Sequence, residues 1–172
     1  MQKKILITGG SGLLAFNWAL STRSNYAVTL LLHHKKISLL GVETDIASLS
    51  SLDECSFILA KHQPDIVIHT AGLTNVEECE ANPDLAQEVN VDLAKNIAIA
   101  CSSQGVKLVH ISTDHLFLGD QEFTTENTST NPVNNYAKTK FLGEQKVLEN
   151  CKDALVIRTN FFGWGAKYRQ SF

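Results

Sequence analysis

The stretch KILITGGSGLLA, residues 4–15, decides the fold of this chain. Residues 5–7 are an apolar run typical of a buried parallel strand. The glycine-rich residues 8–12 follow at once, and the apolar side chains after them recur at mixed helical spacing. A strand, a glycine turn and a helix in this order are typical of the start of a dinucleotide-binding βαβ unit, and a purely structural glycine turn is the alternative.

The small residues of this turn have physical roles in binding a nucleotide. Gly9 allows the tight turn, and Gly12 lets backbone N–H groups approach a pyrophosphate at the positive end of the following helix. Ala15 stands at the third glycine position and is small enough for the helix to pack close to the strand.

The composition is typical of one soluble globular domain. The 172 residues are 44% hydrophobic and 19% charged, enough for a sizeable core. The net charge is −3 with one short basic cluster at residues 33–36, so we expect no nucleic-acid partner. No apolar run approaches the ~20 residues of a membrane span, and the N-terminus reads as a strand and not as a signal peptide, so we expect a cytoplasmic protein. The four cysteines lack metal-ligand spacing, so we predict free thiols and no metal site.

Hydrophobic runs and turn residues predict alternating strands and helices. We expect strands at residues 5–7, 27–32, 41–46, 66–69, 106–111 and 154–158, and helices at residues 12–22, 52–61, 83–104 and 132–150. Residues 119–131 would form a polar active-site loop, and residues 159–172 would add no packed element. Right-handed crossovers then give an α/β fold, a Rossmann-type doubly wound parallel sheet of strand order 3-2-1-4-5-6. Residues 1–172 would form one NAD(P)-binding domain.

The residues after the second strand bear on the cofactor. An acidic residue there binds the adenosine ribose of NAD, whereas basic residues suit the 2′-phosphate of NADP. The chain has His33, His34, Lys35 and Lys36 and no acid, so we favour NADP(H) over NAD(H), with His33 and Lys35 as cofactor-binding residues. A solvated basic loop is the alternative. His69, at the end of the fourth strand, is expected to be a packed, hydrogen-bonded core residue, with a polar site group as the alternative.

Tyr136 and Lys140 are four residues apart on a predicted helix, so they lie on one face. A lysine ammonium at ~4 Å contributes about 4 kcal/mol at an effective dielectric constant of about 20. This energy would lower the pKa of the phenol, which is near 10 when unperturbed, by at most about three units. The pair would make the tyrosine a general acid, and an ordinary amphipathic helix is the alternative. Ser112 and Thr113 end the fifth strand, where a hydroxyl can reach the same carbonyl oxygen.

Several motifs, in the right order along the chain, resemble those of the extended short-chain dehydrogenases/reductases. They are TGGSGLLA (8–15), DI (45–46), HTAG (69–72), NV (90–91), STD (112–114), YAKTK (136–140) and VIRT (156–159). The segments TNVEECE (74–80) and ISTDHLFLG (111–119), and the run from Glu126 through Pro132 to FLGE, resemble the dTDP-4-dehydrorhamnose reductase group in particular.

The resemblance implies a role for each matching residue. The pyrophosphate would be bound by Gly9, Gly12, Leu13 and Leu14. The adenine would lie between Asp45 and Ile46, and the rest of the cofactor would lie along Ala71 and Gly72. Thr113 would hydrogen-bond the substrate carbonyl, and Tyr136 would deliver the proton. Lys140 would hold the nicotinamide ribose and lower the tyrosine pKa. The implied reaction is hydride transfer from NAD(P)H to a keto group of a nucleotide-linked sugar.

The chain departs from the family pattern in two respects. His115 and Leu118 replace the aromatic and small polar residues that usually follow the STD motif. In addition, the sequence stops just past the sixth strand. We therefore expect a fragment of a longer chain, without the C-terminal substrate lobe. The alternatives are a nucleotide-sugar epimerase or dehydratase of the same superfamily, and a non-catalytic NADP-binding regulatory subunit like that of methionine adenosyltransferase, which resembles the same group. The family also implies a homodimer.

Overall fold

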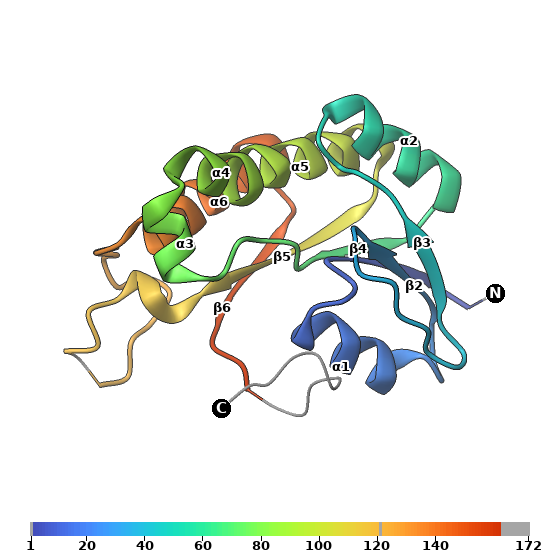
Figure 1. Ribbon diagram of the computed structural model, residues 1–172, viewed down its shortest axis with the longest axis horizontal. Helices are drawn as coiled ribbons and strands as arrows, with labels where there is room; N and C mark the ends of the chain where they lie inside the picture. The colour runs from blue at the N-terminus through green and yellow to red at the C-terminus, as the bar shows by residue number, and fades with distance from the viewer. Residues whose placement is uncertain (1, 121, 163–172) are drawn as a thin grey trace.

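The computed structural model describes residues 2–120 and 122–162, which form one six-stranded parallel sheet (Figure 1). Its strands are β1 (Lys4–Thr8), β2 (Ala27–Leu32), β3 (Glu43–Ile46), β4 (Ile66–His69), β5 (Lys107–Thr113) and β6 (Leu155–Thr159). They lie in the order β3-β2-β1-β4-β5-β6, which confirms the predicted Rossmann-type sheet. The strand order reverses beside β1, so a ligand crevice is expected at the carboxyl ends of β1 and β4.

Helices cover both faces of the sheet (Figure 1). On one face lies α1 (Leu13–Thr22), and on the other lie α2 (Leu52–His62), α5 (Leu93–Gln104) and α6 (Asn135–Asn150). The short segments α3 (Val76–Ala81), α4 (Pro83–Gln87) and the π-helix η1 (Glu88–Asp92) lead into α5, and the 3-10 turn η2 (Asp114–Leu116) follows β5.

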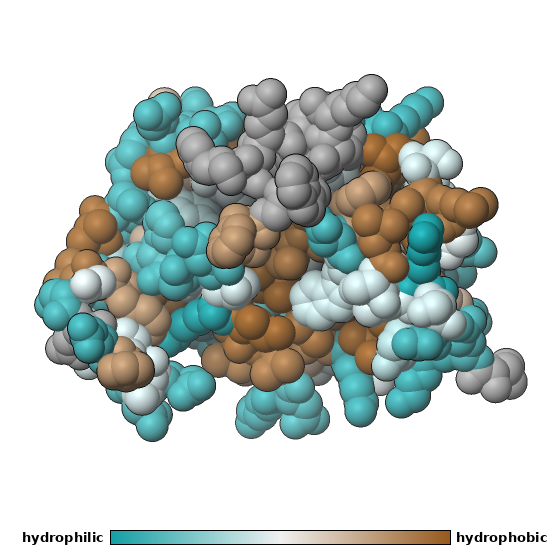
Figure 2. Space-filling model, turned by 90° about the horizontal axis from the view of Figure 1, so that it is seen from below, coloured by the Kyte–Doolittle hydropathy of each residue, from teal (hydrophilic) through white to brown (hydrophobic). Residues whose placement is uncertain are grey.

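Each face of the sheet has its own apolar core. On the side of α1, Ala15 and Ala19 are fully buried against the sheet, which confirms the close packing expected of Ala15. On the other side, Leu59 of α2, Ile97 of α5 and Val147 of α6 belong to one cluster. Figure 2 views the molecule from the side of α1 and shows apolar side chains gathered on this face.

The start of α6 differs from the prediction. The expected start at Pro132 is wrong, because the helix begins at Asn135. The side chain of Asn134 accepts a hydrogen bond from the N–H of Ala137 at 2.8 Å and caps the helix there. Likewise β3 begins at Glu43, two residues later than expected, because Gly41 has a φ of +76° and lies in a turn.

The predicted helix at residues 83–104 is helical but not uniform. It contains the π-helix η1, in which one extra residue is inserted into the helical ladder. The helix α3 lies outside every predicted element, and its N-cap Asn75 accepts from the N–H of Glu78 at 2.8 Å.

Several smaller findings complete the fold. The four cysteines are buried and free, as predicted. None of the helices in the described part of the chain is both long and apolar enough to cross a membrane. Within residues 2–120 and 122–162, no three His, Cys, Asp or Glu side chains are grouped to hold a metal ion. Residues 160–162 add no element, as expected, and residues 163–172 lie outside the described residues.

Candidate active site

The glycine turn joins β1 to α1 at the carboxyl edge of the sheet. Gly9 has a φ of +66°, and a Cβ there would lie 2.8 Å from the backbone nitrogen of Ala71, so this position requires glycine. The N–H of Gly12 donates to the Gly9 carbonyl at 2.7 Å and closes the turn. Because Gly12 is the N-cap of α1, the N–H groups of Leu13 and Leu14 have no acceptor within the helix. They are the donors that this turn offers to an anion.

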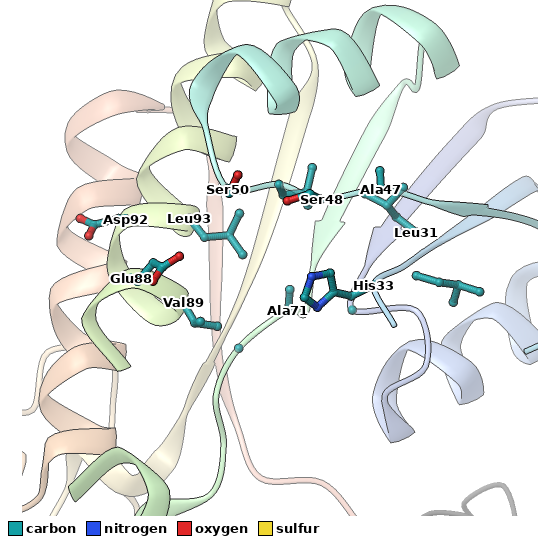
Figure 3. Close-up of a pocket in the computed structure, with 14 residues that line it drawn as sticks. Leu31, His33, Ala47, Ser48, Ser50, Ala71, Glu88, Val89, Asp92 and Leu93 are labelled. Carbon is teal, nitrogen blue, oxygen red and sulfur yellow. The ribbon is translucent and has the colours of Figure 1, made fainter. Parts of the chain in front are cut away.

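Beside the turn lies a pocket of about 340 Å³ (Figure 3). Four predicted cofactor residues, Gly9, His33, Ala71 and Gly72, line it. The other walls come from the end of β2, the segment after β3, and the helices η1 and α5: Leu31, Leu32, Ala47, Ser48, Leu49, Ser50, Glu88, Val89, Asp92 and Leu93. Apolar walls with a few polar groups, next to a glycine turn, suit a nucleoside.

The predicted adenine residues Asp45 and Ile46 do not line this pocket and lie just before the segment that does. The Asp45 carboxylate accepts from Lys61 Nζ at 2.6 Å and lies 2.8 Å from His62 Nε2. The hydrogen bond from Lys61 holds the pKa of Asp45 below its usual value. The carboxylate is therefore held against α2. Lys35 lies in the segment after β2, also outside the lining.

Thr113 and Tyr136 meet at the carboxyl end of β5. Thr113 is the last residue of the strand and Tyr136 lies in the first turn of α6, and both side chains are buried. Burial raises the pKa of Tyr136, and its hydrogen bond to Thr113 offsets part of this rise. The expectation that Lys140 lowers the tyrosine pKa is therefore wrong for this structure, because burial is the largest effect. Tyr136 keeps its proton at neutral pH.

Lys140 lies one helical turn after Tyr136 and is 5% exposed. Its Nζ donates to the carbonyl of Ile111 in β5 at 2.7 Å. Burial lowers the pKa of Lys140 to about 8, and the nearby carboxylate of Glu144 opposes this shift. A Cβ on Gly72 would lie 3.9 Å from Nζ, so the amine lies directly behind the loop that lines the pocket.

Asn90 is a site residue that the sequence reasoning did not single out. It is 2% exposed and lies on η1. Its side chain accepts from the N–H of Leu73 at 2.8 Å and donates to the Leu73 carbonyl at 3.1 Å and to Thr139 Oγ1 at 3.0 Å. Asn90 thus joins the loop after β4 to α6, the helix that carries Tyr136. The only sign of Asn90 in the sequence is its place in the NV motif at residues 90–91, to which no role was assigned.

Two buried histidines lie in neighbouring strands behind the site. His69 Nδ1 and Thr8 Oγ1 are 2.8 Å apart, which confirms the packed, hydrogen-bonded core role expected for His69. His110 of β5 is in register with His69, and the ring centroids are 5.4 Å apart. Burial lowers the pKa of His69 to about 3 and that of His110 well below its usual value, so both rings are neutral at pH 7.

A second pocket, of about 900 Å³, lies between α6, β6 and the segment after β5. Its lining includes Arg158, which pairs with the buried carboxylate of Glu144 at 2.8 Å. The Arg158 guanidinium also lies 5.5 Å from the centre of the Phe117 ring. His115, another lining residue, packs edge-on against the Tyr136 ring at 5.7 Å. This pocket therefore opens beside the tyrosine.

Comparisons with known proteins agree with this geometry. A family model described as the RmlD substrate binding domain matches residues 3–170. The dTDP-4-dehydrorhamnose reductase of Mycolicibacterium smegmatis is 34% identical over 161 residues, which cover 92% of this chain and 46% of the relative. The methionine adenosyltransferase 2 subunit beta of Bos taurus is 32% identical over 159 residues, with 91% and 46% covered.

A solved structure has the same fold. The dTDP-4-dehydrorhamnose reductase of Bacillus anthracis, in complex with NADP, matches with a TM-score of 0.78 at 28% identity, and the match covers 92% of this chain and 53% of that chain. The present chain thus spans about half the length of these relatives. The family model covers nearly all of the chain, which confirms the resemblance noted in the sequence. The chain belongs to the RmlD substrate binding domain family, within the extended short-chain dehydrogenases/reductases.

Proposed function

We propose that this chain is the cofactor-binding and catalytic part of an NADP(H)-dependent reductase of a keto group on a nucleotide-linked sugar. The observation that carries the proposal is the placement of Thr113 and Tyr136 together at the carboxyl end of β5, where both are buried and Lys140 lies one helical turn further along α6. The relatives from M. smegmatis and B. anthracis, both dTDP-4-dehydrorhamnose reductases, support the substrate class.

The residues of the glycine turn fit a dinucleotide. A side chain at Gly9 would fill the space in front of Ala71, and the N–H groups of Leu13 and Leu14 would bind the pyrophosphate. The adenosine would occupy the 340 Å³ pocket, with Ala71 and Gly72 along the cofactor and Asp45 and Ile46 beside the base.

The end of β2 supports NADP(H) as the cofactor. His33 lines the pocket at this end, and Lys35 follows two residues later with no acidic residue between them. Positive charge there favours a 2′-phosphate. The NADP bound to the B. anthracis relative supports the same choice, and NAD(H) is the alternative. Equal affinity for NADPH and NADH in a direct binding measurement would contradict the preference.

The chemistry divides between the cofactor and the side chains of this chain. Bound NADPH supplies the hydride for the keto carbon. Thr113 would donate a hydrogen bond to the keto oxygen and hold it beside the phenol. Tyr136 would donate the proton to that oxygen, which its raised pKa allows because the phenol is protonated at neutral pH. Lys140 would hold the nicotinamide ribose.

The test is NADPH oxidation with a dTDP-linked 4-keto-6-deoxy sugar by the natural protein that contains this chain. Tyr136→Phe should lower turnover by about 10²- to 10⁴-fold, the usual contribution of a general acid, while NADPH still binds. Tyr26→Phe, a matched change in the turn before β2, should keep full turnover. Full turnover by Tyr136→Phe would refute the proposed acid.

A non-catalytic regulatory subunit is a second candidate, which the 32% identity to methionine adenosyltransferase 2 subunit beta supports. NADPH binding without turnover of any keto sugar, together with capture of a partner enzyme, would favour it. The proposal also includes a cytoplasmic location and a homodimer formed through α5 and α6, to which the exposed Leu142 of α6 would contribute. Light scattering of the purified protein tests the dimer.

A further inference from the structure

The nucleoside pocket has two acidic residues in its lining, Glu88 and Asp92, both on the π-helix η1. Figure 3 shows that they point in different directions. The Glu88 carboxylate lies on the side of the helix that faces Ala71 and His33, whereas the Asp92 carboxylate points away from the pocket.

The Glu88 carboxylate is available to a ligand. Glu88 is exposed, and its carboxylate makes no hydrogen bond or ion pair with the described residues. The other carboxylate near this end of the sheet, Asp45, is occupied by Lys61 and His62 and by the N–H of Ile46. Glu88 is therefore the carboxylate that the structure offers to the contents of the pocket.

The pocket itself suits a purine. Figure 3 shows Ala47 on one side of the pocket and Val89 and Leu93 on the other, and Leu49 is a further apolar lining residue. The pocket is therefore an apolar slot between the segment after β3 and the helices η1 and α5. The polar edge of a base in this slot needs a partner at the rim. An ionised carboxylate only accepts hydrogen bonds, so it matches the exocyclic amine of adenine and opposes the carbonyl of hypoxanthine.

We propose that Glu88 makes the cofactor site selective for adenine by accepting a hydrogen bond from the exocyclic amine of the base. This inference rests on the proposed function, because it requires NADP(H) in the 340 Å³ pocket. It adds a residue of η1 to the residues at the end of β3 that the resemblance places beside the base.

The experiment compares the affinity of the chain for NADPH and for its hypoxanthine analogue, reduced nicotinamide hypoxanthine dinucleotide phosphate, by titration calorimetry. The unmodified chain should prefer NADPH by about ten- to hundredfold, the usual effect of one hydrogen bond to a charged group. Glu88→Ala should reduce the preference to within about threefold. Glu88→Gln should do the same, because its amide can donate to the hypoxanthine carbonyl.

Asp84→Ala is the matched control, because it removes the same charge one turn earlier, outside the pocket lining. It should keep the full preference for NADPH. An unchanged preference in Glu88→Ala, or an equal loss in Asp84→Ala, would overturn the inference and leave the proposed function standing. Failure of the unmodified chain to bind either dinucleotide would overturn both. Circular dichroism of each variant shows that the helices are intact.

Discussion

Gly143 of α6 provides a test of how closely this helix packs against the π-helix η1. A Cβ built on Gly143 overlaps the backbone carbonyl oxygen of Asn90, and lies 3.9 Å from the Cβ of Ala94. The overlapped atom belongs to the main chain of η1, so it cannot rotate away as a flexible side chain would. Gly143→Ala must therefore push α6 away from η1.

Two opposing effects set the size of the change. Alanine in a helix interior is favoured over glycine by up to about 1 kcal/mol. Overpacking of a well-packed interior costs about 1–3 kcal/mol, and an overlap with backbone belongs in the upper half of that range. The net loss in the free energy of unfolding is then about 1–2 kcal/mol. For a chain of this size, it lowers Tm by about 2–8 °C.

Thermal unfolding followed by circular dichroism measures this loss directly. Gln145→Ala, on the exposed side of the same helix, is the control and should stay within about 0.5 kcal/mol of the unmodified chain. NADPH affinity should also fall in Gly143→Ala, because moving α6 stretches the hydrogen bond between Asn90 and Thr139. A Tm above that of the unmodified chain would show that helix propensity dominates and would refute the argument from close packing.

Three further predictions concern buried charges and can be measured by urea unfolding. Arg158→Leu should lower the free energy of unfolding by about 3–5 kcal/mol, because it leaves the buried Glu144 carboxylate unpaired. Removing both the Arg158 and the Glu144 charged groups should lower it by less. An equal loss in the single and the double variant would refute this reasoning. Lys140 should contribute stability that grows as pH rises from about 8 to 10.5, because the unfolded state keeps the Lys140 proton that the folded state has lost. The buried cysteines, whose pKa values burial raises, act in the opposite direction but are shared with Lys140→Met. The difference in the free energy of unfolding between the unmodified chain and Lys140→Met should therefore move in favour of the unmodified chain over this range, and a difference that does not change with pH would contradict the reasoning. As pH falls from 6.5 towards 3, stability should decrease, because the unfolded chain protonates His69 and His110, which stay neutral in the folded chain. His110→Gln should weaken this decrease. The same pH profile in His110→Gln as in the unmodified chain would show that the buried histidine does not cause the decrease.

The sheet and the glycine turn were predictable because their signals are local. Continuous apolar runs between turn residues mark buried parallel strands, and the right-handed crossover rule then orders them. Gly9 was predictable for the same reason, since only glycine takes a φ of +66° with the backbone of Ala71 so close. The four-residue spacing pointed to the tyrosine and the lysine, the resemblance implied their roles, and the fold brought the tyrosine to Thr113.

The π-helix and its consequences were not predictable, because helical periodicity does not reveal one inserted residue. The apolar positions of residues 83–104 fit a single helix, yet η1 turns Asn90 inward to Leu73 and Thr139. Glu88, also on η1, faces the pocket (Figure 3). The role of Asn90 also depends on the packing of α6 against η1, and the spacing of residues within either segment does not reveal this packing.

The direction of the Tyr136 pKa shift shows where reasoning from spacing alone fails, and it bears on the pH dependence of the proposed proton transfer. Spacing placed a cation on the same helix face but gave no measure of burial, and burial raises the phenol pKa here. In the proposed reaction, the protonated phenol is the form that donates to the keto oxygen, and Tyr136 is in this form at neutral pH. Oxidation of the alcohol needs the phenolate, so the rate of the reverse reaction should rise with pH well above neutrality. A reverse rate that is flat from pH 7 to 10 would show that Tyr136 is not the group that exchanges the proton.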